Sequence, residues 1–370
     1  MRILYVCFYN DLNGIQKERI LSSAGQDKTE YLIELMVASS LKVDVVSFAY
    51  SNSPTEVKDE DVLNDGFKVH YFASKFSKNR IINHLRLIKF KIRALFYLLR
   101  NIKENDVVLV YHSLFYMKLI NTLKRIKRNT RFLIQAEEIY SIVWYKNKKS
   151  IKKEIAYLKR FKNIIVSNDS LAEKLSFPSD AALVLPGNYN YRGKINDFKK
   201  DKIDVVYSGN TDPSIYDLYS TIEAFDLLPQ NYRLHILCSG SDEEMRALES
   251  LSSDRVLIYK ELHGSLYSSF LSKCDIGICP RRPNDFNQSS FPSKILTYLR
   301  HGLRVVSSNF FTSENELKKY ITIYQHNSPT EIANAILSAQ TTGMDNAKDY
   351  IIAKNKEFSK KLVDFIGEFK

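Results

Sequence analysis

The residue types best suited to chemistry gather in the C-terminal half, where cationic side chains flank short apolar runs. Arg281 and Arg282 come directly after the run 275–279, and Ser293 and Lys294 open a segment with helical periodicity. A serine at a helix start can satisfy free backbone N–H groups, and the helix N-terminus itself attracts anions. Guanidinium and ammonium groups from separate loops can therefore converge on a diphosphate. The alternative is an ordinary capped helix beside two solvated arginines.

Candidate acid–base groups follow two apolar runs of the N-terminal half. His112 comes after the run 106–110, and Glu137 and Glu138 come after the run 131–136. Adjacent carboxylates in a strand-to-loop turn are poor core residues, so one of them is expected to act as a general base or to orient an acceptor hydroxyl. The alternatives are a solvated acidic pair or a helix cap, and for His112 a buried structural histidine.

Both halves alternate short apolar runs with longer segments of helical periodicity. This rhythm predicts an α/β fold of two doubly wound domains, built from right-handed β-α-β units and parallel sheets covered on both faces. Ligands of such folds bind beyond the carboxyl ends of the strands, where the candidate residues lie. The expected strands are 2–9, 43–50, 67–73, 106–112, 131–136, 163–167, 181–185, 203–208, 232–238, 255–260, 275–279, 303–307 and 321–325.

The polar segment 188–202, rich in Gly, Asn and Lys, predicts a linker between the two domains. We therefore expect one Rossmann-like domain over residues 1–187 and a second over 203–342. The last segment, 343–370, has the pattern of an amphipathic helix and is expected to pack back toward the N-terminal domain.

The segment from Cys279 to Ser308 resembles the donor-binding signature of the glycosyl transferases group 1 family, in the subset with a P-R…N-D…F-P-S-K…Y-L…G…V-V pattern. The resemblance implies the GT-B fold, in which two Rossmann-like domains face each other across a cleft. It implies an acceptor in the first domain, a nucleotide-diphosphate sugar in the second, and His112 against the donor sugar. The donor-binding residues it implies are Gly14, Ser208, Gly209, Asn210, Arg281, Arg282, Asp285, Phe291, Ser293, Lys294 and Thr297.

The resemblance further implies an enzyme that transfers a sugar, most simply a hexose, with retention of configuration during surface polysaccharide assembly. The donor would be UDP- or GDP-linked, and the acceptor a glycan or a sugar carried on polyprenyl diphosphate. Arg281 and Lys294 would stabilise the departing diphosphate. With such a cationic site to balance the charge of the diphosphate, we expect no metal ion and no cofactor.

Two departures from the family pattern leave a second interpretation open. Ser289 and Thr297 stand where the family usually has glutamates, and Gly209 is followed by Asn210-Thr211 in place of a basic pair. A non-catalytic subunit that binds a nucleotide sugar or a partner would share the remaining features. A dinucleotide-dependent oxidoreductase would also share the α/β rhythm, but no G-x-G-x-x-G turn follows Tyr9.

The net charge of +12 is concentrated in the N-terminal half, which holds 33 Lys and Arg against 19 Asp and Glu. Residues 80–103 carry seven basic side chains among many apolar ones and no acidic side chain. Further basic clusters lie at 124–131 and 146–162. Such a face suits an anionic membrane surface, since each basic group near it contributes about 1 kcal/mol. A core helix with a solvated basic side is the alternative. Nucleic acid is not expected as a partner, because no recognition signature or stacking platform is present.

Composition and chain length exclude several classes of protein. In 370 residues, 44% hydrophobic and 26% charged, two cores can be buried, so a disordered chain is excluded. The four cysteines form no C-x-x-C pair, which argues against structural zinc and a disulfide framework. No apolar run approaches about 18 residues, and no signal-peptide pattern opens the chain. We expect a cytoplasmic protein that is peripheral on the inner face of the plasma membrane.

Overall fold

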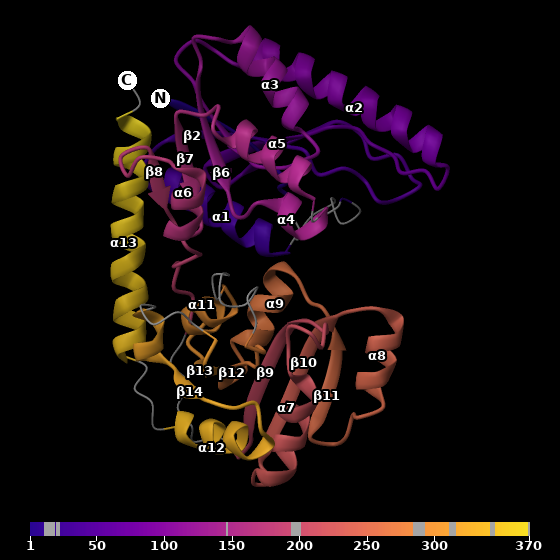
Figure 1. Cartoon of the computed structure of the whole chain (residues 1–370), viewed down its shortest axis with the longest axis vertical. Coiled ribbons are helices and arrows are strands. Elements are labelled where there is room, and N and C mark those ends of the chain that lie inside the picture. The colour runs from indigo at the N-terminus through magenta and orange to yellow at the C-terminus, as the bar shows by residue number, and fades with distance from the viewer. Residues whose placement is uncertain are drawn as a thin grey trace. The chain divides into compact units, whose positions relative to one another are not determined.

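The computed structural model divides the chain into two compact units. Unit 1 contains Met1–Gly187 together with Lys356–Lys370, and unit 2 contains Asn188–Asn355. Each is an α/β unit built on its own sheet (Figure 1). The structure describes residues 1–10, 19, 23–145, 147–193, 201–283, 293–310, 316–340 and 345–368.

Unit 1 is built on an eight-stranded sheet in the order β3-β4-β2-β1-β5-β6-β7-β8. All neighbours are parallel except β3 and β4 at the edge. The sequence pattern did not predict β3, because this edge strand is short, acidic and alternately exposed rather than apolar. The strands are β1 (Arg2–Cys7), β2 (Lys42–Ser47), β3 (Glu60–Asn64), β4 (Phe67–Tyr71), β5 (Val107–Tyr111), β6 (Arg131–Ala136), β7 (Asn163–Val166) and β8 (Ala182–Val184).

Helices cover both faces of this sheet. Right-handed crossovers place the helices that follow β4, β5, β6 and β7 on one face, because those connections all advance in the same direction along the strand order. One apolar core joins these helices to the even-numbered residues of β1. The helices on this face are α2 (Arg80–Asn101), α3 (Met117–Ile126), α4 (Tyr140–Trp144), α5 (Lys148–Leu158) and α6 (Asp169–Leu175), and α1 (Ser23–Ala38) follows β1 in the opposite sense.

Unit 2 is built on a fully parallel six-stranded sheet in the order β11-β10-β9-β12-β13-β14. Its strands are β9 (Ile203–Asn210), β10 (Tyr232–Ser239), β11 (Val256–Lys260), β12 (Ile276–Cys279), β13 (Arg304–Ser308) and β14 (Thr322–Tyr324). Its helices are α7 (Leu218–Ala224), η1 (Phe225–Leu227), α8 (Asp242–Glu249), α9 (Gly264–Leu271), α11 (Ser293–Arg300), η2 (Glu316–Tyr320) and α12 (Pro329–Ala339).

The C-terminal helix α13 (Asp345–Gly367) contributes to both units. Its residues up to Asn355 are grouped with unit 2, where the Tyr350 ring stacks on Tyr320 at 4.5 Å. From Lys356 onward it is part of unit 1, and Phe358, Leu362 and Ile366 are buried there.

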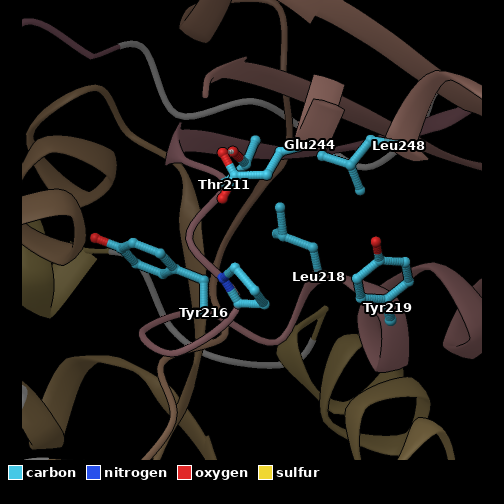
Figure 2. Close-up of a pocket in the computed structure, with 7 residues that line it drawn as sticks. Thr211, Tyr216, Leu218, Tyr219, Glu244 and Leu248 are labelled. Atoms are coloured by element: carbon cyan, nitrogen blue, oxygen red, sulfur yellow. Dashed lines mark hydrogen bonds between the residues drawn. The ribbon is translucent and has the colours of Figure 1, made fainter. Parts of the chain in front are cut away.

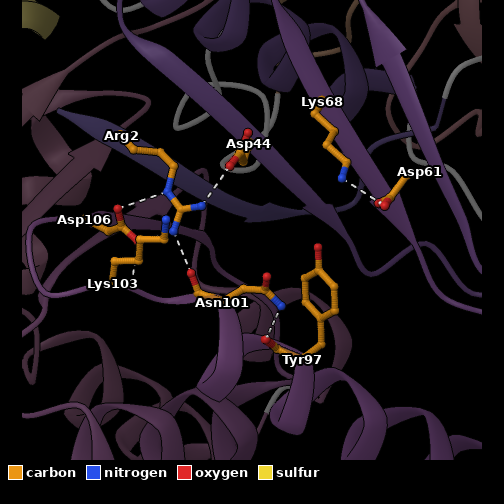
Figure 3. Close-up of polar contacts among 8 residues, drawn as sticks. All are labelled: Arg2, Asp44, Asp61, Lys68, Tyr97, Asn101, Lys103 and Asp106. Carbon is orange, nitrogen blue, oxygen red and sulfur yellow. Dashed lines mark hydrogen bonds and ion pairs between the residues drawn. The ribbon is translucent and has the colours of Figure 1, made fainter.

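Arg2 ties the amino-terminal edge of the unit 1 sheet together (Figure 3). Its guanidinium donates to Asp106 at 3.0 Å and to Asp44 at 3.0 Å, and to the carbonyl of Asn101 at 2.6 Å. These partners belong to β2, to the end of α2 and to the residue before β5. Although burial acts against it, the hydrogen bond from Arg2 holds the pKa of Asp106 below its usual 3.8.

Replacing Arg2 with Met should lower the free energy of unfolding at pH 7 by about 2 kcal/mol, because the nearly buried Asp106 carboxylate loses its counter-charge. Urea denaturation measures the change. Lys68→Met is the matched control, since Lys68 and Asp61 form an exposed pair that should contribute under about 1 kcal/mol. Equal effects of the two substitutions would contradict the anchoring role of Arg2.

Candidate functional site

A long-range backbone pairing holds the segment that carries the two arginines. Tyr216 forms an isolated antiparallel bridge with Arg281. The N–H of Arg282 donates to the carbonyl of Ile215 at 2.8 Å, and the N–H of Asp217 donates to the carbonyl of Pro280 at 2.8 Å. The loop after β9 is thereby fastened to the loop after β12, at the carboxyl edge of the unit 2 sheet.

The Arg281 side chain is buried beside two aromatic rings. It is 6% exposed, and its guanidinium carbon lies 4.8 Å from the centre of the Phe310 ring and 5.9 Å from that of Tyr216. Both distances are within the range of cation–π attraction. The Ser308 hydroxyl donates to the Arg281 carbonyl at 2.6 Å, which further fixes this residue. A cation held in this way has few alternative positions.

The second arginine, Arg282, is engaged differently. Its guanidinium pairs with Asp217 at 3.0 Å, and its side chain is 42% exposed while the carboxylate is buried. Asp217 therefore neutralises part of the charge of Arg282.

Lys294 belongs to the first turn of α11 and contacts a hydrogen-bonded network at the end of β9. Its Nζ lies 5.5 Å from the centre of the Tyr267 ring, and the Tyr267 hydroxyl is 2.6 Å from the Ser208 hydroxyl. The N–H of Ser208 donates to the Tyr298 hydroxyl at 2.8 Å. The ring of Tyr298 fits there because Gly277 has no side chain: a Cβ would lie 2.3 Å from it.

The charges of Arg281 and Lys294 act on the same two groups. Burial raises the pKa of the Tyr216 phenol and of the Cys279 thiol, and both cations partly offset that increase. The loop after β12 and the start of α11 therefore create a single positively charged region at the edge of the sheet.

The other predicted donor residues occupy a range of settings. The Thr297 hydroxyl donates to the carbonyl of Ser293 at 2.9 Å within α11, and Thr297 is only 9% exposed. Gly209 adjoins Tyr207, whose hydroxyl would lie 2.8 Å from an added Cβ, and the same hydroxyl donates to the Asn210 carbonyl at 2.5 Å. Three of the predicted residues lie outside the described part of the chain: Gly14, Asp285 and Phe291.

A small, shallow hollow that is open to solvent lies next to this region (Figure 2). Thr211 and Glu244 lie together at one end, where the Thr211 hydroxyl donates to the carboxylate at 3.1 Å, and leucine side chains line the other. Tyr216 also lines it, which connects the hollow to Arg281. No local sequence pattern marks Tyr216, which lies six positions beyond β9, so its place in this hollow could not be predicted.

In unit 1, His112 follows β5 as expected but is fully buried. Its Nε2 lies 2.6 Å from Oε1 of Glu154, which is also fully buried. The carboxylate of Glu154 also accepts the N–H groups of Tyr140 and Ser141 at the start of α4, at 2.8 and 2.7 Å. Although burial acts against it, these bonds keep the pKa of Glu154 below 4.5. These hydrogen bonds hold the start of α4 in place. His112 thus has the environment of a buried structural histidine, which was one of the two interpretations of this residue from the sequence.

Glu137 and Glu138 follow β6 and are both partly exposed. Glu137 accepts the Gln135 side-chain N–H at 2.6 Å, and its carbonyl accepts the Ser167 hydroxyl at 2.7 Å. Burial, and then the charges of Glu137 and Glu154, raise the pKa of Glu138. Glu138 is therefore a better proton acceptor than an ordinary exposed glutamate.

The sequence over residues 202–341 matches the model of the family Glycosyl transferases group 1. No curated relative matches the chain. Among solved structures, the chain is similar to an apo form of OtsA, with 12% identity, a TM-score of 0.66 and coverage of 100% of this chain and 99% of that one.

Two ligand-bound structures show the same likeness. One is the E. coli trehalose-6-phosphate synthase bound with UDP-2-fluoro glucose, with 12% identity, a TM-score of 0.66 and coverage of 100% and 99%. The other is the UDP-forming α,α-trehalose-phosphate synthase of Burkholderia xenovorans in complex with glucose-6-phosphate, with 9% identity, a TM-score of 0.66 and full coverage of both chains. The fold is therefore GT-B, as the sequence predicted.

Replacing Glu154 with Ala should lower the free energy of unfolding at pH 7 by about 3 kcal/mol, because His112 and the start of α4 lose a buried partner. Since the folded pKa of Glu154 lies below its usual 4.5, this stabilisation is present above that pH and is lost as the pH falls through the folded pKa. Denaturant titrations at pH 7 and pH 4 measure both effects. Glu173→Ala, at an exposed site on α6, should change little, and a similar loss there would contradict the assignment.

Proposed function

Because residues 202–341 are a glycosyl transferases group 1 domain and the chain is a glycosyltransferase of the GT-B fold, we propose that unit 2 binds a nucleotide-diphosphate sugar at the carboxyl edge of its sheet. The observation that carries the proposal is that Arg281, buried beside Tyr216, and Lys294, beside Tyr267, both lie at this edge of the sheet. Two cations from separate loops of one sheet edge match the charge of a diphosphate.

The proposed reaction breaks the bond between the anomeric carbon and the diphosphate oxygen, and it forms a bond from that carbon to an acceptor hydroxyl oxygen. The negative charge that develops on the leaving group is stabilised by Arg281, by Lys294 and by the backbone N–H groups at the start of α11. The buried Arg281 is already oriented by Phe310 and Tyr216, so little reorganisation is required when the charge develops. The resemblance of the motif implies a reaction without a metal ion and with retention of configuration. In a single step, retention requires that the acceptor hydroxyl approach the same face of the sugar from which the diphosphate departs.

Glu138 is proposed to take the proton from the acceptor hydroxyl, because its raised pKa makes it a stronger base than an ordinary exposed glutamate. Glu137 is proposed to orient the acceptor, since its carboxylate is already held by Gln135. His112 is proposed to act indirectly, by holding Glu154 and through it the segment that begins at Tyr140.

The proposed donor is a UDP-linked sugar, since one similar structure holds UDP-2-fluoro glucose. A GDP-linked sugar is the second choice. The proposed acceptor is a glycan or a sugar on polyprenyl diphosphate, used in surface polysaccharide assembly on the cytoplasmic face of the plasma membrane. The excess of basic residues in the first half of the chain supports an acceptor that lies on an anionic membrane.

One observation favours a second candidate, a non-catalytic subunit that binds a nucleotide sugar. Thr297 stands where the family usually has a glutamate, and its hydroxyl is used inside α11. A neutral, internally bonded group cannot grip a ribose as a carboxylate would. Donor binding without hydrolysis or transfer, under conditions that include membrane extract, would support this candidate over the enzyme.

Replacing Lys294 with Ala should weaken the binding of UDP or GDP at least about 10-fold, because a charge-assisted contact to phosphate is lost. Isothermal titration of the full chain measures the affinity. Lys202→Ala is the control, since this exposed lysine precedes β9 at the opposite edge of the same sheet. Unchanged affinity of the Lys294 variant would remove its proposed phosphate role.

Replacing Glu138 with Gln should reduce the rate of transfer at least about 100-fold and leave donor affinity unchanged, because general-base assistance is lost but the diphosphate site is intact. In the unaltered chain, the rate should fall as the pH drops through a pKa above 4.5, where Glu138 takes up a proton. The pH dependence of kcat tests both statements. A variant with a normal rate would exclude Glu138 as the base, and Glu173→Gln serves as the control.

A further inference from the structure

Helix α2 presents a row of large apolar side chains to solvent. On its inner side, Phe90, Ala94 and Leu98 are buried in the core of unit 1. On its outer side, apolar residues recur every three or four positions and are 42% to 73% exposed, namely Ile81, Leu85, Ile88, Ile92 and Phe96. A helix that is apolar on its outer side as well as its inner side is not explained by the core of its own unit.

The row extends onto the beginning of the next helix. Phe115, just before α3, is 50% exposed, and the Nζ of Lys91 lies 4.5 Å from the centre of its ring. Figure 1 shows α2 as a long helix with α3 beside it. Lys91 thus links the exposed strip of α2 to the exposed ring of Phe115, with a basic group beside it.

Cations outnumber carboxylates around this strip, although Arg93 of α2 forms an ion pair with Asp59. Helices α2, α3 and α5, which all cover the same face of the sheet, carry thirteen Lys and Arg residues. Their one acidic residue, Glu154, is fully buried against His112. Exposed lysines on α5 extend the charge across the face, namely Lys148, Lys149, Lys152 and Lys153. We call the outer surface of α2, α3 and α5 the basic apolar face.

The charge of the basic apolar face selects among its possible occupants. A second copy of the chain in a two-fold dimer would place like charges against each other. Nucleic acid would leave the aliphatic strip uncovered, since backbone recognition uses cations and stacking uses aromatic rings. An anionic bilayer matches both the apolar strip and the cations around it. Apolar side chains enter the acyl region, while lysine and arginine side chains remain among the headgroup phosphates.

We propose that the basic apolar face docks the protein on an anionic membrane, with α2 lying in the plane of the interface. Its 22 residues span roughly 33 Å along the surface. In the part of the chain that the structure covers, no helix is both long and apolar enough to span a bilayer. This inference rests on the proposed function for the membrane-borne acceptor, but lipid binding itself can be measured without any sugar donor.

The first test is sedimentation of the full chain with vesicles of phosphatidylcholine alone or with 30 mol% phosphatidylglycerol, a composition we choose as roughly that of an anionic leaflet. The chain should partition onto the anionic vesicles, and added salt should weaken this binding. The variant Leu85→Gln/Ile92→Gln should bind at least about 10-fold more weakly, because two inserted side chains lose their apolar surface.

The matched control is Leu227→Gln/Leu251→Gln, which changes leucines of unit 2 with exposures of 56% and 38%. It should bind vesicles like the unaltered chain. Glutamine keeps the helix propensity of α2, and thermal unfolding of each variant verifies the fold. Equal losses in both variants, or equal binding to neutral and anionic vesicles, would overturn the proposal.

A second variant, Lys148→Gln/Lys149→Gln/Lys152→Gln/Lys153→Gln, tests the charge separately. It should bind anionic vesicles at least about 10-fold more weakly and with a smaller salt dependence. If Leu85→Gln/Ile92→Gln instead abolishes self-association in sedimentation velocity while vesicle binding is unchanged, the face is a dimer interface and the proposal fails. Nucleotide affinity, measured without vesicles, should be the same in all these variants, so loss of docking and loss of the donor site are told apart.

Discussion

A parallel sheet covered by helices on both faces can gather polar groups only where its strands end. In unit 2, the main contact that brings polar groups together at this edge is the backbone pairing of Tyr216 with Arg281. It joins the loop after β9 to the loop after β12. Once that pairing is in place, the guanidinium is confined beside Phe310, and the Ser308 hydroxyl completes its support. The cationic region of the site thus depends on a backbone contact between residues 65 positions apart.

The sequence predicted the two α/β units well, because parallel strands buried on both faces read as short apolar runs. The strand β3 escaped prediction because it lies at an edge and carries acidic residues in place of such a run. The cationic candidates were found for the same reason as the strands: Arg281 directly follows an apolar run, and Lys294 opens a helix. Tyr216, Tyr267 and Phe310 were not found, since their roles arise only from tertiary contacts.

The arginines of this chain show how a carboxylate partner changes what a cation can do. Arg2 is held by Asp44 and Asp106 and stabilises a sheet edge. Arg282 shares its charge with Asp217, whereas Arg281, one residue earlier, is buried beside the rings of Phe310 and Tyr216. Sequence position does not separate these cases, because the partners come from other strands and loops.

Because α13 belongs partly to unit 2 and partly to unit 1, the two units cannot be separated by cutting the chain at one position. The chain changes unit twice, after Gly187 and after Asn355, so unit 1 is not a continuous stretch of sequence. A fragment ending at Gly187 would lack Phe358, Leu362 and Ile366, all buried in the intact chain, and would leave uncovered the apolar surface beneath them. Isolating the first unit therefore calls for a fusion that restores residues 356–368 by a short connection, rather than for a simple truncation.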